Sequence, residues 1–446
     1  MTDRNEGHVA RQRQRLTASV TDLDVTRQRA LLVGLIRSND QRSRGLASLH
    51  ELGLLTDTAG SEPVLSELVR RERPDPATYI GKGKLEELVA ISRTEDIDVV
   101  VFDNDLSPAQ QRNLQAAFAC DVVDRVALIL DIFAQHAHTK EGMLQVELAQ
   151  YRYRLPRLRG KGTVLSRLGA GIGTRGPGET KLETDRRRIL ERVRKIEREL
   201  KDAGRSRATR SKQRKGSGDP MVAIVGYTNA GKSTLFNRLT DAGVLVEDRL
   251  FATLDSTVRK LMLPDGHTAL VSDTVGFVRD LPHELIEAFR STLEEVGDAD
   301  LLVHLVDASD DDPDHQVDSV RSVLDAVGAG HLPELIVFNK IDAVDGTTLE
   351  RLRSLHPDAQ FMSAQTGEGV DAVLDATVAA LKASTVELEL VIPYHRGEVL
   401  ADAHETGTVL DQRHDDTATV ITVRLPHEAA ARFRGFVAPE PGTIDA

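Results

Sequence analysis

The stretch MVAIVGYTNAGKST (221–234) contains the most informative motif of the chain. Its apolar start, 221–226, predicts a buried strand, and the residues from Gly226 to Ser233 spell G-x-x-x-x-G-K-S. In such a loop the glycines let backbone amides converge on phosphates. Lys232 reaches the β- and γ-phosphate oxygens, and the serine hydroxyl ligates Mg²⁺. Because a strand is expected before the loop and a helix after it, we interpret the stretch as a phosphate-binding loop and not as a chance turn.

A second motif, DTVG (273–276), follows the apolar run HTALVS (267–272). Asp273 therefore stands at the carboxyl end of an expected strand, where it can hold Mg²⁺ through a water molecule. The backbone N–H of Gly276 can be offered to a γ-phosphate. Open α/β sheets bind ligands at the carboxyl ends of their strands, so this motif and the phosphate loop are expected to meet.

Two later motifs predict recognition of a guanine base. NKID (339–342) follows an apolar run, and the carboxylate of Asp342 can accept from the N1–H and the 2-amino group of guanine, which adenine lacks. Asn339 and Lys340 are expected to fix this loop. SAQTG (363–367) follows the last expected strand and offers a backbone amide to guanine O6. Four motifs in this order predict a GTP site.

The segment LFATLDST (250–257) is expected to close over the γ-phosphate. By spacing, Thr253 and Thr257 are both candidates for a second hydroxyl ligand to Mg²⁺, although the β-branched Thr257 also suits a strand. Phe277 follows DTVG, and its side chain has no donor or acceptor with which to orient the attacking water. We therefore predict slow intrinsic turnover, or a partner that completes the site.

Positive charge is concentrated in residues 151–215, which contain 22 Lys and Arg against 7 Asp and Glu, although the whole chain has a formal net charge of −13. Ion pairing along a helix cannot absorb this excess, so we expect a polyanion site. Apolar stripes at helical spacing begin at Leu144 and Leu182 and predict a long antiparallel helical hairpin. Residues 205–220 show no periodicity and favour a flexible basic linker.

The stretch GAGIGTRGPGET (169–180) lies near the expected hairpin tip. Its glycines fit a dinucleotide-binding fingerprint, but the preceding residues 154–168 are basic and contain no buried strand, so we reject that interpretation. Glycines let a backbone approach RNA phosphates closely, and Arg175 can fork onto a phosphate or a guanine edge. We therefore expect Gly173, Arg175 and Gly176 to contact RNA, instead of forming only a flexible connection.

Elsewhere strands and helices alternate, which predicts a parallel sheet covered on both faces near the N-terminus. There we expect strands at 30–36, 63–69 and 97–102 and helices at 43–53, 83–95 and 107–119. The expected units are a polar tail (1–27), an N-terminal α/β domain (28–138), the hairpin with its basic linker (139–218), a Ras-like P-loop domain (219–384), and a small α+β domain (385–446) built as strand, helix, strand, strand, helix. The predicted fold class is therefore multidomain α/β.

The composition excludes several classes of protein. No window holds 18 consecutive apolar residues, and the N-terminus is polar, so we expect neither a membrane span nor a signal peptide. Cys120 is the only cysteine and cannot form an internal disulfide or a zinc cage; we expect it to be a small buried apolar residue. We expect a cytoplasmic monomer.

From about residue 28 to 384 the chain resembles the HflX family of translational GTPases, within the Obg–HflX group. The resemblance rests on GYTNAGKSTLFN, LFATLD, DTVGFVRDLP and NKID, and on RPDPATYIGKGK (73–84), LSPAQQRNL (106–114), LILDIFAQHAHTKEGMLQVELAQ (128–150) and GTRGPGETKLETDRR (173–187). It implies that Thr253 is the Mg²⁺ threonine, and that the protein binds the large ribosomal subunit with the hairpin tip in ribosomal RNA near the peptidyl-transferase region.

Bacterial members of this family split stalled ribosomes. The chain departs most from the family pattern at 385–446 and 205–215, so ribosome dissociation or recycling and large-subunit biogenesis both stay open.

Catalytic roles fall to Lys232, Thr253 and Gly276, and the expected Mg²⁺ ligands are Ser233, Thr253 and, through water, Asp273. The full set expected to bind GTP is Gly226, Tyr227, Thr228, Asn229, Ala230, Gly231, Lys232, Ser233, Phe251, Ala252, Thr253, Leu254, Asp255, Asp273, Thr274, Val275, Gly276, Asn339, Lys340, Ile341, Asp342, Ser363, Ala364 and Gln365.

Two other classes of function agree less well with these motifs. A P-loop ATPase or RNA-remodelling factor is disfavoured by NKID, although the basic, glycine-rich GKGK (81–84) leaves open a second nucleotide in the N-terminal domain. A turn before a helix explains GKGK more simply. A non-catalytic RNA-binding scaffold is disfavoured because Lys232, Ser233 and Asp273 are all present.

Overall fold

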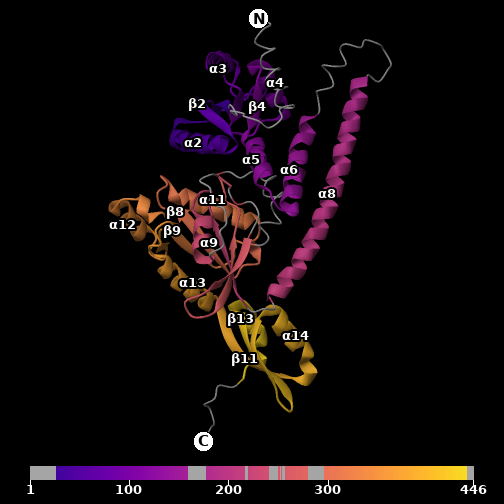
Figure 1. The fold of residues 1–446 in the computed structure, drawn as a ribbon, viewed down its shortest axis with the longest axis vertical. Coiled ribbons are helices and arrows are strands. Elements are labelled where there is room, and N and C mark those ends of the chain that lie inside the picture. The colour runs from indigo at the N-terminus through magenta and orange to yellow at the C-terminus, as the bar shows by residue number, and fades with distance from the viewer. Residues whose placement is uncertain are drawn as a thin grey trace, which may run out of the picture.

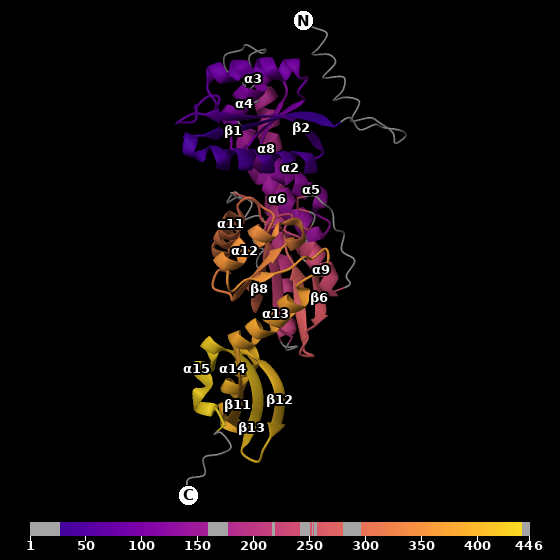
Figure 2. The same cartoon turned by 90° about the vertical axis from the view of Figure 1, so that its left-hand side faces the viewer.

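The computed structural model describes residues 27–158, 177–215, 219–240, 250–251, 253, 257–279 and 296–438. Three sheets follow one another along the long axis, and the helices α6 (Lys140–Arg157) and α8 (Pro177–Lys215) form a hairpin that extends beside the first two (Figures 1 and 2). The predicted fold class, multidomain α/β with a helical hairpin and a P-loop domain, is confirmed.

An all-parallel sheet of strand order β2-β1-β3-β4 forms the N-terminal part. Its elements are β1 (Gln28–Ile36), η1 (Asn39–Gln41), α2 (Arg42–Thr58), β2 (Ser61–Arg70), α3 (Lys82–Thr94), β3 (Val99–Phe102), α4 (Pro108–Phe118), β4 (Asp121–Asp124) and α5 (Arg125–His136). Leu32 packs with α2 and α5, whereas Leu31 and Val33 pack with α3 and α4 on the other face, where the half-buried Cys120 also lies. Burial on both faces explains the continuous apolar sequence of β1.

One helix boundary in this part was predicted wrongly. The helix expected to end at Gly53 continues as α2 to Thr58. Gly53 lies inside the helix close to the side chain of Leu32, and tertiary packing therefore outweighs its weak helix propensity. The helix ends just before Gly60, whose φ of +89° is the left-handed conformation that glycine adopts readily.

The hairpin is held by an apolar seam and by ion pairs. Leu144 and Leu148 of α6 bury themselves against Ile196 of α8, as the two stripes predicted. Arg192 donates to both carboxylate oxygens of Glu147, at 2.8 and 2.6 Å, and this pairing lowers the pKa of Glu147. Such a bidentate pair fixes the register of the two helices.

The prediction of a flexible linker beyond residue 205 was wrong, because α8 continues without a break to Lys215. Arg, Lys, Gln and Ala are good helix formers, and a helix needs no apolar periodicity where it does not pack against a core. Residues 159–176, which include most of the expected tip, lie outside the described part of the chain.

A six-stranded sheet follows, in the order β10-β9-β8-β5-β7-β6, and only β6 is antiparallel to its neighbour. Its elements are β5 (Met221–Gly226), α9 (Lys232–Thr240), β6 (Thr257–Met262), β7 (Thr268–Asp273), β8 (Leu301–Asp307), α11 (Pro313–Ala326), β9 (Glu334–Asn339), η2 (Ile341–Ala343), α12 (Gly346–Leu355), β10 (Gln360–Phe361) and α13 (Val370–Ser384). Strand β6 was not among the expected strands. The four sequence motifs follow the carboxyl ends of β5, β7, β9 and β10, at one edge of this sheet.

The C-terminal unit is an antiparallel sheet of order β11-β13-β12 covered by two helices, with the predicted order of elements. Its elements are β11 (Thr385–Pro393), η3 (Tyr394–Arg396), α14 (Gly397–Thr406), β12 (Thr408–His414), β13 (Ala418–Pro426), α15 (His427–Phe433) and η4 (Arg434–Phe436). Leu390, Ile421 and Phe433 form its core. Among the described helices, none is both long enough and apolar enough to cross a membrane.

Candidate nucleotide site

The phosphate loop leaves β5 at Gly226 and enters α9 at Lys232. Gly226 has a φ of +153°, and a Cβ there would lie 2.2 Å from the carbonyl oxygen of Leu305. Gly231 has a φ of +92°, and its Cβ would lie 2.3 Å from Nδ2 of Asn339. A side chain at either position would clash with the neighbouring strand ends, so both glycines are required for the loop to lie this close to the sheet.

Lys232 is buried at the centre of the loop and is only 6% exposed. Its Nζ donates to the carbonyl oxygen of Tyr227 at 2.7 Å. Burial lowers the pKa of Lys232 to about 8, and the nearby carboxylate of Asp273 opposes this shift. A Cβ added to Gly276 would lie 3.0 Å from Nζ, which places the DTVG motif directly against the lysine, as expected from the shared sheet edge.

Three oxygen-bearing side chains from separate segments meet beside this lysine. The hydroxyls of Ser233 and Thr253 lie 2.7 Å apart, and both hydroxyls donate to Oδ2 of Asp273, at 2.8 and 3.1 Å respectively. Asp273 is fully buried, its Oδ1 has no hydrogen-bond partner within the described residues, and burial raises its pKa. Two hydroxyls and a buried carboxylate suit a hard divalent cation such as Mg²⁺. Thr253, and not Thr257 in β6, joins this cluster.

The expected base-binding loop is tied to the phosphate loop. Asn339 is 2% exposed; its Nδ2 donates to the carbonyl oxygen of Ala230 at 2.7 Å, and its Oδ1 accepts from the backbone N–H of Ala364 at 2.8 Å. Lys340 has a φ of +65° and pairs with Asp307 at 2.6 Å. Asp342 follows in η2 and is exposed, so its carboxylate is accessible to a base.

The structure adds one residue that the sequence motifs did not indicate. Arg238 of α9 donates through Nε to the carbonyl oxygen of Ala364 and through Nη2 to that of Gln365, both at 2.6 Å. It therefore holds the SAQTG loop against the helix that follows the phosphate loop. Arg238 belongs to no motif, and only the folded proximity of α9 to this loop shows its role.

The remaining predicted residues divide into two groups. Thr274 and Val275 are buried beside β5, where the Thr274 hydroxyl donates to the carbonyl oxygen of Ile224 at 2.7 Å. Tyr227, Thr228, Asn229, Phe251, Ile341 and Ser363 lie in the same group of loops. Outside the described residues lie Ala252, Leu254 and Asp255, together with the expected RNA contacts Gly173, Arg175 and Gly176.

The two lysines of GKGK have different surroundings: Lys84 is paired, whereas the side chain of Lys82 is 90% exposed and its Nζ lies 4.0 Å from Glu86. Helix α3 begins at Lys82, directly after Gly81, and the side chain of Arg71 lies against that glycine. Nζ of Lys84 pairs with Glu67 at 3.1 Å and with Glu87 at 2.7 Å. These contacts agree with the simpler expectation, a turn before a helix.

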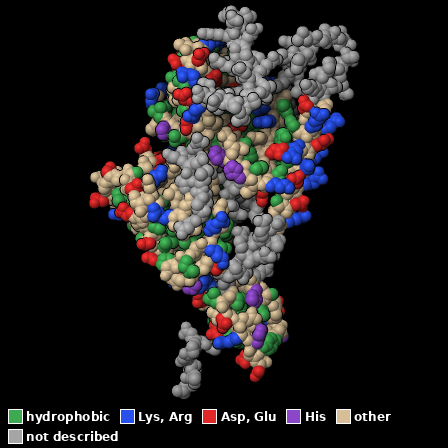
Figure 3. Space-filling view, in the orientation of Figure 1, with side chains coloured by type: hydrophobic (Ala, Val, Ile, Leu, Met, Phe, Trp, Pro, Cys, Tyr) green, Lys and Arg blue, Asp and Glu red, His purple; other side chains and the backbone are tan. Residues whose placement is uncertain are grey.

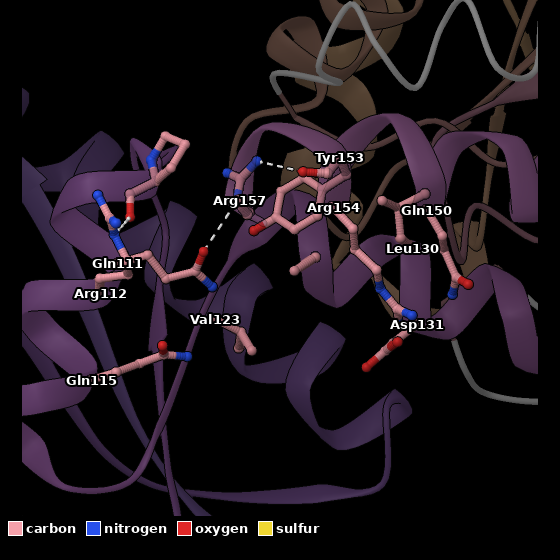
Figure 4. A pocket seen from close by; sticks show the side chains of 12 residues that line it. Gln111, Arg112, Gln115, Val123, Leu130, Asp131, Gln150, Tyr153, Arg154 and Arg157 are labelled. Atoms are coloured by element: carbon pink, nitrogen blue, oxygen red, sulfur yellow. Dashed lines mark hydrogen bonds between the residues drawn. The ribbon is translucent and has the colours of Figure 1, made fainter. Parts of the chain in front are cut away.

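A separate pocket of about 250 Å³ lies between α4, α5 and α6 (Figure 4). Its most constrained residue is Arg157, which donates to Asp124, to Gln111 and to the carbonyl oxygen of Leu106. Asp131 lies at the opposite side near Arg154; burial raises the pKa of Asp131 and Arg154 opposes the shift. The charged side chains of this pocket join the carboxyl end of α6 to the N-terminal sheet.

Sequence models of three families match the chain. They are described as "GTP-binding GTPase N-terminal" (residues 46–134), "GTP-binding GTPase Middle Region" (136–214) and "50S ribosome-binding GTPase" (221–340).

Close relatives span nearly the whole chain. "GTPase HflX" of Caldanaerobacter subterraneus subsp. tengcongensis is 44% identical over 411 residues, which cover 92% of this chain and 94% of the relative. "GTPase HflX" of Escherichia coli is 38% identical over 421 residues, with 94% and 97% covered. Among solved structures, a GTP-binding protein from the archaeon Sulfolobus solfataricus in complex with GDP is 22% identical, with a TM-score of 0.40, and covers 80% of this chain and 99% of its own.

Proposed function

The chain belongs to the HflX family of GTPases, and from that premise we propose that it hydrolyses GTP with Mg²⁺ in association with the large ribosomal subunit. The convergence of Ser233, Thr253 and Asp273 carries the first half of this proposal. Ser233 and Thr253 would hold the metal directly, and Asp273 would hold it through water. The metal would neutralise charge on the β- and γ-phosphates.

The roles of the other groups follow from their positions. Lys232 clamps the β- and γ-phosphates, because its Nζ lies between the phosphate loop and Gly276. Gly276 offers its backbone N–H to the γ-phosphate. Asp342 selects guanine, while Asn339 and Ala364 hold the base loop in register with the phosphate loop.

The ribosomal half of the proposal is supported by the hairpin and by the family descriptions. The matched model for residues 221–340 carries the description "50S ribosome-binding GTPase". Lys and Arg side chains are spread along α8, interspersed with Asp and Glu (Figure 3). Basic residues on the hairpin, together with the glycine-rich sequence around Arg175 that joins its two helices, suit a narrow cavity in ribosomal RNA.

We propose that the protein acts in translation as a cytoplasmic monomer, either in dissociating and recycling ribosomes or in large-subunit biogenesis. The working units are 28–138, 139–218, 219–384 and 385–446. The γ-phosphate of bound GTP would engage Thr253 and Gly276 and favour binding to the subunit, and hydrolysis would remove these contacts.

Sedimentation with purified ribosomal subunits tests this function. The protein is incubated with GDP or with a non-hydrolysable GTP analogue, and the bound fraction is measured after centrifugation through sucrose. We expect binding to the large subunit with the analogue and much weaker binding with GDP. Equal binding with both nucleotides, or binding to the small subunit alone, would contradict the proposal.

A further inference from the structure

A buried carboxylate of the N-terminal part reaches into the nucleotide site. Glu51 of α2 is 9% exposed, and its Oε1 accepts from the hydroxyl of Tyr227 in the phosphate loop at 2.5 Å. The same oxygen accepts from the backbone N–H of Arg279 at 3.3 Å. Arg279 lies three residues after Gly276, so Glu51 touches two of the segments that surround the γ-phosphate position.

The other side of this carboxylate is held by an arginine. Nη2 of Arg125 donates to Oε2 of Glu51 at 2.5 Å, and its Nη1 donates to Asp103 at 2.8 Å. Nη2 also reaches the carbonyl oxygen of Arg279, at 3.3 Å. Burial alone would lower the pKa of Arg125, but the carboxylates of Glu51 and Asp103 raise this pKa above its usual value. Both residues are buried in the N-terminal domain, and both contact the backbone of Arg279 in the P-loop domain.

Apolar contacts extend the same interface to a third segment, which contains Phe251 and Thr253. Phe251 has a φ of +60°, which a bulky residue rarely adopts, and its ring meets the ring of Phe133 edge-on at 4.6 Å. Phe277 is fully buried in the same cluster, and its backbone pairs with Gly226 and Thr228. A strained backbone persists only where its surroundings hold it, so the contact with Phe133 supports the conformation that brings Thr253 to Asp273.

These contacts have one consequence for catalysis. They hold three residues: Tyr227 in the phosphate loop, Phe251 two residues before Thr253, and Arg279 three residues after Gly276. We propose that Glu51 is a positioning residue for GTP hydrolysis, which holds Tyr227 and the backbone of Arg279 so that the γ-phosphate-binding segments keep their closed arrangement. GDP lacks the γ-phosphate and does not use Thr253 or Gly276. By linkage, loss of this contact weakens binding of GTP relative to GDP.

The test compares Glu51→Ala with Glu51→Gln in the full-length protein. For each we would measure kcat, KM and the affinities for GDP and a non-hydrolysable GTP analogue. We expect Glu51→Ala to lower kcat and the ratio of analogue to GDP affinity by about tenfold, the scale of one lost charge-assisted hydrogen bond. Affinity for GDP should stay at the parental value. Glu51→Gln keeps an acceptor for the hydroxyl of Tyr227, so its kcat and its affinity ratio should lie between those of Glu51→Ala and the parent.

Asp124→Asn is the control, because Asp124 is also a buried carboxylate of the same domain, and its partners are Leu106, Ala127, Tyr153 and Arg157. It should leave the affinity ratio unchanged. If Glu51→Ala does not fold, Tyr227→Phe removes the hydroxyl alone and should reproduce the loss in the ratio. The proposal is overturned if the folded variants keep the parental ratio and kcat, if turnover rises, or if Asp124→Asn gives the same loss.

Discussion

Asn339 joins the base loop to the phosphate loop: its Nδ2 donates to the carbonyl oxygen of Ala230 at 2.7 Å. Its Oδ1 accepts from the N–H of Ala364, so one side chain connects three loops that come from distant parts of the sequence. The nucleotide site is therefore one connected unit, and its loops are not independent of each other.

Removing this connection should destabilise the domain even without nucleotide. Asn339→Ala leaves two buried backbone groups unpaired, at a cost of about 1–3 kcal/mol each. We expect a lower midpoint of thermal unfolding for the nucleotide-free protein and weaker binding of both GTP and GDP. The exposed Asp342 offers the comparison, since Asp342→Asn should leave that midpoint unchanged. A parental midpoint for Asn339→Ala would mean that the loops are held by other contacts.

Asp342→Asn should change which base is bound. The carboxamide cannot accept both N–H groups of guanine, but its NH₂ can donate to the 2-oxo group of xanthine. We expect affinity for GTP to fall by about tenfold or more and affinity for xanthosine triphosphate to rise. Recovery with the xanthine nucleotide controls for misfolding. If Asp342→Asn bound GTP as tightly as the parent, another group would select the base.

Stability should depend on pH through Glu334 of β9. Burial alone would raise its pKa, but hydrogen bonds from His304 and Arg321 lower the pKa of Glu334 to about 2. Because the folded pKa lies below the usual value of 4.5, this contribution is complete above about pH 4.5 and is lost as pH falls toward 2. It amounts to roughly 3 kcal/mol at most.

The measurement is the free energy of unfolding in urea between pH 6 and pH 3 for Glu334→Gln and the parent. We expect the variant to be less stable at pH 6 and the two curves to converge at low pH. Glu350→Gln removes the same charge at an exposed position of α12 and should follow the parent. Parallel curves for Glu334→Gln and the parent would contradict the assignment.

The hairpin tip should matter for the ribosome and not for the nucleotide. We would replace residues 171–178 with a Gly/Ser linker of equal length, which removes Arg175. Basal GTP hydrolysis should survive, because the nucleotide loops all lie after residue 220. Binding to the large subunit should fall sharply. Parental binding would make the tip a simple connection between two helices.

Much of the nucleotide site could be predicted because its motifs are local. Gly231 and Lys232 belong to a single loop whose spacing is fixed by the phosphates it surrounds, and Asp273 and Asn339 are each placed by the end of a buried strand. The alternation of strands and helices predicted parallel strands, but it predicted neither the order of the strands nor β6.

Residues that act across the fold could not be predicted in the same way. Glu51 looks like one polar residue of an ordinary helix, and Arg238 carries no motif; both take their partners from segments more than a hundred residues away. The continuation of α8 to Lys215 was missed because the prediction relied on apolar periodicity, whereas Arg, Lys, Gln and Ala are good helix formers without it.

The rate of GTP hydrolysis with and without purified large ribosomal subunits tests the central claim most directly. Phe277 is buried and cannot orient the attacking water, so the free protein should turn over slowly. We predict that saturating large subunits raise kcat by at least tenfold, about the effect of one well-placed group in the site, and that Lys232→Ala abolishes hydrolysis in both conditions. A free enzyme already at the stimulated rate, or one that large subunits leave unchanged, would contradict the account.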